Sequence, residues 1–173
     1  MTVSEEKKRV TVFWLIPAKP QRELFGKIIR ILADEFGAPR FEPHLTLGLA
    51  PEERSPRNLL KRIQASPISL RIRGIAYSDK FTKTLFIRFE NTPGLEKLVG
   101  DLGSNPKSLR DPHLSLIYRR LSEATKRELA ATINLPFRDV LFDVIKAVNC
   151  VSPTETRQDV ENWHVTATKR LSA

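Results

Sequence analysis

Cysteine is almost absent from this chain of 173 residues, which has only Cys150. A single cysteine cannot form an intramolecular disulfide, and it excludes both a thiolate zinc cluster and the disulfide scaffold of small secreted proteins. Glycine is scarce as well, with seven residues, which excludes a collagen-like chain. Because 40% of the residues are hydrophobic, a disordered chain is also excluded. We expect one folded domain over residues 1–173 in a reducing, cytoplasmic compartment.

Long hydrophobic runs are missing too. The longest apolar run, residues 12–16, is far shorter than the roughly 20 residues that span a bilayer. The first nine residues are polar, and no apolar stretch long enough for a signal peptide follows them. The sequence therefore predicts a soluble protein without a membrane partner.

Acidic residues are the minority. Lys and Arg number 29 against 20 Asp and Glu, which gives a formal charge of +9 and favours phosphate-bearing partners such as nucleotides or RNA. Two basic groups either steer phosphates toward a site or form solvated faces, and the sequence leaves both readings open. They are Arg54, Arg57, Lys61, Arg62, Arg71 and Arg73, and separately Arg119, Arg120, Lys126 and Arg127.

The hydrophobic pattern predicts alternating strands and helices. Residues 10–16 are β-branched and aromatic, which favours a buried strand, and helical periodicity follows from Pro20 to Phe36. Residues 44–49 alternate strictly, so we expect His44, Thr46 and Gly48 on one face of a strand and three leucines on the other. The other expected elements are helices over residues 56–64, 93–102 and 122–133 and strands over 68–75, 84–89, 113–118, 137–148 and 163–171.

One five-residue motif occurs twice. Pro-His-Leu-Thr-Leu at residues 43–47 returns as Pro-His-Leu-Ser-Leu at residues 112–116, with His44 and His113 69 residues apart. The repeat suggests two equivalent half-units. Because residues two apart on a strand point the same way, each half would carry an imidazole and a hydroxyl side by side.

Two imidazoles and two hydroxyls suit the cleavage of a phosphodiester. The reaction needs a base to deprotonate water, an acid to protonate the leaving oxygen, and donors to the non-bridging oxygens. With an ordinary pKa of about 6.5, two histidines can supply base and acid near neutral pH. Thr46 and Ser115 can donate to the phosphate. This chemistry needs no metal or cofactor, and the sequence has no obvious Asp/Glu/His cluster for a metal.

The paired motifs resemble the signature of the two-histidine phosphoesterase superfamily, His-x-Thr/Ser-x with apolar residues at x. Within it the chain is most similar to cyclic phosphodiesterases that open ADP-ribose 1″,2″-cyclic phosphate and nucleoside 2′,3′-cyclic phosphates. The residues that carry this resemblance are Trp-Leu-Ile-Pro at 14–17, the segment 36–47 and the segment 112–118.

The resemblance implies a bilobal, duplicated α+β fold, with two antiparallel sheets facing a central cleft and helices packed outside. It further implies an acid/base pair, His44 and His113, phosphate ligands Thr46 and Ser115, and contacts to base or sugar from Tyr118 and Trp14. Tyr118 lies an odd number of residues from His113, so on a regular strand its side chain would point to the opposite face. For Tyr118 to lie in the cleft, a bulge or the end of the strand must turn it inward. We expect His113 as base and His44 as acid, although the near-symmetric motifs leave the reverse open.

The sequence thus predicts a monomeric, metal-independent hydrolase acting on a cyclic nucleotide or ADP-ribose cyclic phosphate. One alternative is an RNA-end enzyme similar to the RNA 2′,3′-cyclic phosphodiesterases, also described as 2′-5′ RNA ligases. Another is a nucleotide or RNA binding module without catalysis. A third His-x-Thr, at His164, lacks the preceding proline, so we expect it on an outer surface. The sequence leaves open the exact substrate and whether the product is a 2′- or a 3′-phosphate.

Overall fold

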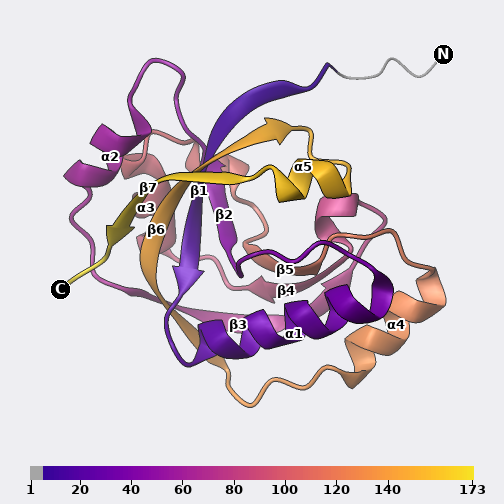
Figure 1. Ribbon diagram of the computed structural model, residues 1–173. Coiled ribbons are helices and arrows are strands. Elements are labelled where there is room, and N and C mark those ends of the chain that lie inside the picture. The colour runs from indigo at the N-terminus through magenta and orange to yellow at the C-terminus, as the bar shows by residue number, and fades with distance from the viewer. Residues whose placement is uncertain (1–5) are drawn as a thin grey trace.

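The computed structural model describes residues 6–173 (Figure 1). Residues 1–5, part of the polar segment that argued against a signal peptide, lie outside the described residues. All the expected strands and helices are present, whereas α5 and two short 3-10 helices, Phe81–Lys83 and Pro106–Ser108, were not expected. The elements are β1 (Lys8–Pro17), α1 (Gln21–Phe36), β2 (Leu45–Leu49), α2 (Pro56–Arg62), β3 (Ile68–Tyr77), β4 (Leu85–Phe89), α3 (Pro93–Asp101), β5 (His113–Ile117), α4 (Glu123–Thr132), β6 (Asp139–Ser152), α5 (Arg157–Glu161) and β7 (His164–Arg170).

Local signals explain where the helices begin and end. Gly37 ends α1 in the left-handed conformation at φ 62°, which a residue without Cβ adopts at little cost. Ser55, Thr92 and Ser122 cap α2, α3 and α4, because each side chain accepts a hydrogen bond from a backbone N–H of the first turn.

The strands form one antiparallel sheet in the order β1-β2-β5-β4-β3-β6-β7, and β1 also pairs with β6. One half of the sheet consists of β1, β2, β6 and β7, and the other half consists of β3, β4 and β5. The two halves meet at two narrow junctions. One is the single pair Leu45–Leu114 between β2 and β5, and the other is a short ladder between β3 and the start of β6. The predicted α+β class with antiparallel sheets is confirmed, and the two sheets are continuous at these junctions.

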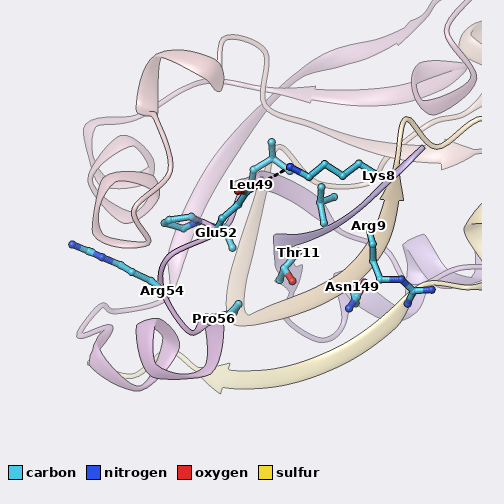
Figure 2. A pocket seen from close by; sticks show the side chains of 11 residues that line it. Lys8, Arg9, Thr11, Leu49, Glu52, Arg54, Pro56 and Asn149 are labelled. Carbon is cyan, nitrogen blue, oxygen red and sulfur yellow. Dashed lines mark hydrogen bonds and ion pairs between the residues drawn. The ribbon is translucent and has the colours of Figure 1, made fainter. Parts of the chain in front are cut away.

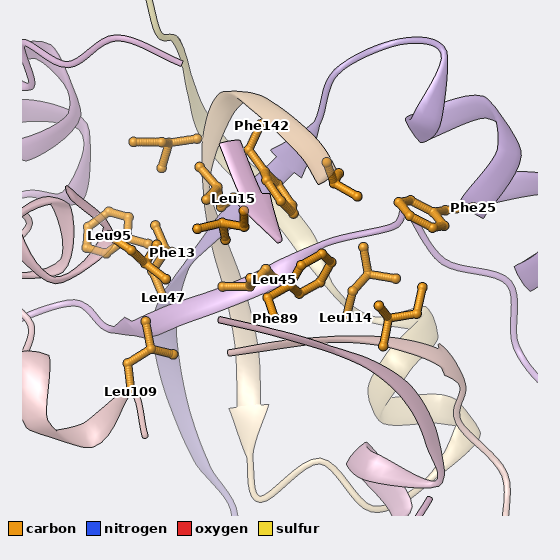
Figure 3. Close-up of a cluster of buried hydrophobic side chains, with 14 of the residues drawn as sticks. Phe13, Leu15, Phe25, Leu45, Leu47, Phe89, Leu95, Leu109, Leu114 and Phe142 are labelled. Atoms are coloured by element: carbon orange, nitrogen blue, oxygen red, sulfur yellow. The ribbon is translucent and has the colours of Figure 1, made fainter. Parts of the chain in front are cut away.

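The main core lies inside this closed arrangement of strands, and the helices surround it (Figure 1). Figure 3 shows leucines of both repeated motifs packed together with Phe13, Phe89 and Phe142. Leu45, Leu47, Leu114 and Leu116 are at most 1% exposed. The apolar face of each motif is therefore core, which leaves the opposite face for polar side chains. Among residues 6–173, no helix has the length and apolar character needed to cross a membrane.

The duplication is visible in the topology. The sequence β1-α1-β2 is repeated as β4-α3-β5, and each strand pair is antiparallel. Trp14 lies opposite Thr46 in the first half as Phe86 lies opposite Ser115 in the second. The two predicted half-units thus have the same strand register at their motifs.

Both motif strands contain a β-bulge at the second leucine of the motif. A bulge adds one residue to one strand, so each side chain after it lies on the face opposite to the one that strict alternation predicts. As a result Leu49, which strict alternation placed on the inner face, is paired with Val12 and is 56% exposed at the rim of a cavity. The expectation for Leu49 was wrong. The equivalent residue of the second half is Tyr118.

Candidate active site

A cavity of about 410 Å³ lies on the polar face of the two motifs. Five of the six predicted site residues line it, namely Trp14, His44, Thr46, His113 and Tyr118. The sixth, Ser115, is 4% exposed and lies just behind the wall, opposite Phe86. Both half-units therefore contribute to a single cleft.

Each catalytic candidate is held by the backbone immediately before it. The Nδ1–H of His44 donates to the carbonyl of Glu42 at 2.7 Å, and the Nδ1–H of His113 donates to the carbonyl of Asp111 at 2.8 Å. When Nδ1 carries the proton, Nε2 is the nitrogen that can accept or deliver one. Each imidazole is thus oriented so that Nε2 remains for chemistry.

Ion pairs fix the two segments that supply these carbonyls. The Glu42 carboxylate accepts from Lys146 of β6 at 2.7 Å. Asp111 binds Lys83 at 2.6 Å and Arg88 at 2.9 Å. Although burial alone raises the pKa of Asp111, these two cations bring it below its ordinary value. The acidic residue before each Pro-His therefore anchors the turn that positions the imidazole.

The cleft contains no fixed charge. Among the described residues that line it, none is Lys, Arg, Asp or Glu. Burial lowers the pKa of His44 to about 4, partly opposed by its hydrogen bond to Glu42. Burial also lowers the pKa of His113, although this side chain is less enclosed. In the empty cleft both imidazoles are therefore neutral at pH 7.

The two hydroxyls are not equivalent. Thr46 is exposed to the cavity. Ser115 donates its hydroxyl proton to the carbonyl of Thr82 at 2.7 Å. Thr46 can donate to a bound oxyanion directly, whereas Ser115 must first turn its proton away from Thr82.

Aromatic rings enclose His44. Trp14 stacks on the imidazole, with centroids 3.7 Å apart and planes 12° apart. Trp163 meets the imidazole edge-on at 5.5 Å. The Tyr118 hydroxyl lies 3.5 Å from His44 Nε2, and burial raises the pKa of this phenol, which keeps it protonated. The bulge in β5 turns Tyr118 inward, as a role in the cleft required.

Sequence reasoning missed several parts of the wall, among them Thr82, Trp163 and the segment 150–154, which includes Cys150. Thr82 could have been found, because the duplication makes it the counterpart of Val10, and both line the cleft. Trp163 had no comparable signal, since it reaches His44 only through the packing of the turn between α5 and β7. His164 is exposed on β7 and does not line the cleft, as expected for an outer histidine.

The structure also tests the basic groups and the metal-binding potential. Lys126, grouped above with charges that could steer phosphates, is only 2% exposed and binds Asp79 at 2.7 Å, so that interpretation was wrong for Lys126. Within residues 6–173, no group of three or more His, Cys, Asp or Glu side chains is arranged to hold a metal ion.

The chain is similar to two named proteins over more than nine-tenths of its length. No protein-family model matches the chain. A protein of Arabidopsis thaliana named cyclic phosphodiesterase is 24% identical, covering 98% of this chain and 99% of that protein. A Phaeosphaeria nodorum protein named 2′,3′-cyclic-nucleotide 3′-phosphodiesterase is 29% identical, covering 91% of this chain and 97% of that protein.

Solved structures show the same fold. The E. coli LigT complex with ATP superposes with a TM-score of 0.59 at 12% identity, covering 97% of this chain and all of LigT. The LigT complex with 3′-AMP gives 0.56 at 11% identity, covering 95% of this chain and 99% of LigT. The fold is therefore common to both chains although few residues are identical.

Proposed function

We propose that the chain is a cyclic-phosphodiesterase-like member of the two-histidine phosphoesterase superfamily and that it hydrolyses a cyclic phosphate to a phosphomonoester. The observation that carries the proposal is the placement of His44 and His113 on the wall of one uncharged cavity, each with Nδ1 committed to a carbonyl. Such a pair supplies the base and the acid that opening a cyclic diester requires.

The reaction balances with one water molecule. One Nε2 takes a proton from water as its oxygen bonds to phosphorus, and the bond from phosphorus to one ribose oxygen breaks. The other imidazole, as imidazolium, gives its Nε2 proton to that departing oxygen. Thr46, and Ser115 once its proton leaves the Thr82 carbonyl, donate to the non-bridging oxygens.

We assign the base to His113 and the acid to His44. His44 can act as an acid only if the bound phosphate raises its pKa from about 4, because a general acid must carry a proton. An anion beside a buried imidazole stabilises imidazolium, and the cleft offers no lysine or arginine to compete for that anion.

The substrate we propose is a small cyclic phosphate, either a nucleoside 2′,3′-cyclic phosphate or ADP-ribose 1″,2″-cyclic phosphate. The cavity of about 410 Å³ falls in the usual range for small-molecule sites, which supports this class. The lack of cations on its wall gives an RNA backbone no partner inside the cleft. We further propose that the enzyme is metal-independent and monomeric. We also propose that it is located in the cytoplasm, because a chain with a single cysteine suits a reducing compartment.

The test is turnover in EDTA of a 2′,3′-cyclic mononucleotide, ADP-ribose 1″,2″-cyclic phosphate and an RNA with a cyclic phosphate end. We expect the small substrates to be hydrolysed by the wild-type protein. His44→Ala and His113→Ala should each lower kcat by at least about 100-fold, the usual size of an acid/base contribution. His164→Ala is the matched control and should keep wild-type activity, because His164 lies outside the cleft.

Three outcomes would contradict parts of this proposal. Loss of all turnover in EDTA, restored by a divalent metal, would remove metal independence. Preference for the RNA would replace the small-molecule substrate class. Binding of every substrate without hydrolysis would leave a binding module in place of an enzyme.

A further inference from the structure

A second cavity, of about 550 Å³, lies on the opposite face of the strands that build the cleft. Val10, Val12 and Trp14 of β1 face the cleft, so Arg9 and Thr11, the two neighbours of Val10, face the other way. Asn149 of β6 is paired with Thr11 and shares its face. Toward the molecule's centre this face is the buried core, beginning with Phe13 and Ala147. The second cavity is therefore a pocket at the open end of the core, lined by both apolar and polar or charged side chains.

The floor of this pocket contains an unsatisfied polar atom. The Oδ1 of Asn149 is buried and has no hydrogen-bond donor among the described residues. Nearly all buried acceptors in native proteins are paired, so a lone one at a cavity wall needs an explanation. Figure 2 shows Asn149 and Thr11 close together in this pocket. Because Oδ1 is shielded from solvent, the Asn149 amide must turn toward the cavity before a ligand O–H or N–H can complete the pairing.

The rim of the pocket is positively charged. Lys8 of β1 reaches Glu52, in the loop after β2, and forms an ion pair across the pocket (Figure 2). Arg9 has no ion-pair partner within residues 6–173, which leaves its guanidinium for an anion. Arg54 also borders the pocket, but Figure 2 shows its side chain extending away. The pocket thus presents a cation above a floor that carries an unpaired acceptor.

We propose that this pocket binds a nucleoside monophosphate. The guanidinium of Arg9 binds the phosphate, as its planar fork of donors does for phosphates generally, and Lys8 adds a second charge when it leaves Glu52. Once the Asn149 amide turns toward the cavity, a ribose hydroxyl or base amino group donates to its Oδ1. The pocket volume is within the range of nucleotide-sized sites.

The pocket and the catalytic cleft share two wall residues, Val10 and Leu49. A ligand in the pocket therefore contacts residues that also shape the cleft rim. The inference does not rest on the proposed hydrolysis, because binding on this face is measured without turnover.

The experiment is calorimetric titration of the full chain with 5′-AMP. We expect the wild-type protein to bind 5′-AMP in the pocket, whether or not the cleft also binds it. Asn149→Leu, which removes the acceptor at similar volume, and Arg9→Ala should each weaken this pocket binding by about tenfold or more. Arg30→Ala, which removes an equal charge from the exposed face of α1, should leave binding unchanged. His113→Ala should leave the pocket event intact.

The absence of 5′-AMP binding to the wild-type protein would overturn the proposal, as would binding that Asn149→Leu and Arg9→Ala both leave unchanged. Binding that is lost in His113→Ala and kept in Arg9→Ala belongs to the cleft and would also overturn it. Inorganic phosphate tests the nucleoside part. If phosphate alone binds the pocket as tightly as 5′-AMP, the site is an anion site and the proposed ligand is wrong. If Asn149→Leu fails to fold, Arg9→Ala still decides, because Arg9 is an exposed side chain at the rim.

Discussion

The charge of each candidate catalytic histidine follows from its surroundings. His44 is 4% exposed beneath Trp14, and burial lowers its pKa to about 4. Burial also lowers the pKa of His113. Since no lysine or arginine lines the described cleft, a protonated imidazole is the cation an anion would find there. Anion binding and protonation should therefore be coupled.

Sulfate, which mimics phosphate but does not titrate near neutral pH, measures this coupling. Both histidine pKa values are lowered, so above them the protonated fraction falls as pH rises, and affinity must fall with it. We expect sulfate to bind about tenfold more weakly per pH unit from about pH 6.5 to 8. Calorimetry in two buffers of different ionisation enthalpy should show uptake of about one proton per sulfate at about pH 7. Affinity independent of pH would contradict the coupling.

The two phosphate-ligand candidates should differ on mutation. Thr46 faces the cavity, so Thr46→Val should lower kcat/KM about 100-fold, the effect of losing one oxyanion donor. Ser115 hydrogen-bonds the Thr82 carbonyl, so Ser115→Ala should lower stability by about 1 kcal/mol as well as activity. Steady-state kinetics and urea unfolding separate the two effects. If Thr46→Val and Thr46→Ser both keep wild-type kinetics, the assignment of Thr46 as a phosphate ligand is wrong.

At the scale of elements, α4 supports the cleft from outside. Lys126 extends from α4 and donates to the Ser78 carbonyl at 3.0 Å and to Asp79 at 2.7 Å. Ser78 and Asp79 begin the loop that carries Thr82 to the cleft wall and to Ser115. A buried cation on a helix thus holds a loop that in turn holds a site residue.

Lys126→Met should therefore affect both folding and activity. We expect a loss of about 1–3 kcal/mol in the free energy of unfolding, because the Ser78 carbonyl and Asp79 lose a charged donor. Turnover should fall by about tenfold as the Thr82 loop loosens. Arg127→Met, the exposed neighbour on α4, serves as the control and should change neither. Unchanged kinetics in Lys126→Met would show that the loop stays in place without it.

At the scale of the whole molecule, the cleft exists because two half-units close on each other. β1 pairs with β6 along its entire length, and β6 continues into the ladder with β3. The core cluster runs through both halves, from Phe13 and Leu15 to Phe89 and Leu95. Neither half buries its motif leucines alone, so the two should unfold together.

Leu95→Ala tests this cooperativity. Leu95 lies on α3 in the second half and is fully buried, so its truncation should cost about 2–5 kcal/mol. Both tryptophans, Trp14 and Trp163, lie in the other half. We expect their fluorescence midpoint in urea to fall together with the circular dichroism midpoint. A fluorescence transition that stays at the wild-type midpoint would mean that the halves unfold independently.

Much of the molecule follows from local sequence. Within residues 6–173, periodicity predicted every strand and four of the five α-helices, because apolar spacing on a helix or strand is set by the backbone geometry itself. The repeated motif also placed an imidazole and a hydroxyl on the face opposite buried leucines, since alternation along a strand needs no partner. These features depend only on residues near each other in the chain.

Contacts between distant segments decided the rest. The bulges that turn Leu49 and Tyr118 toward the cleft depend on how β2 pairs with β1 and how β5 pairs with β4. The alternation of residues within one strand carries no information about that pairing. Trp163 and Thr82 join the wall only when the chain closes. Burial beside Trp14 and Trp163 lowers the pKa of His44. The sequence alone determined which groups are available for acid/base chemistry, whereas the tertiary structure decided their protonation, because desolvation depends on everything packed around them.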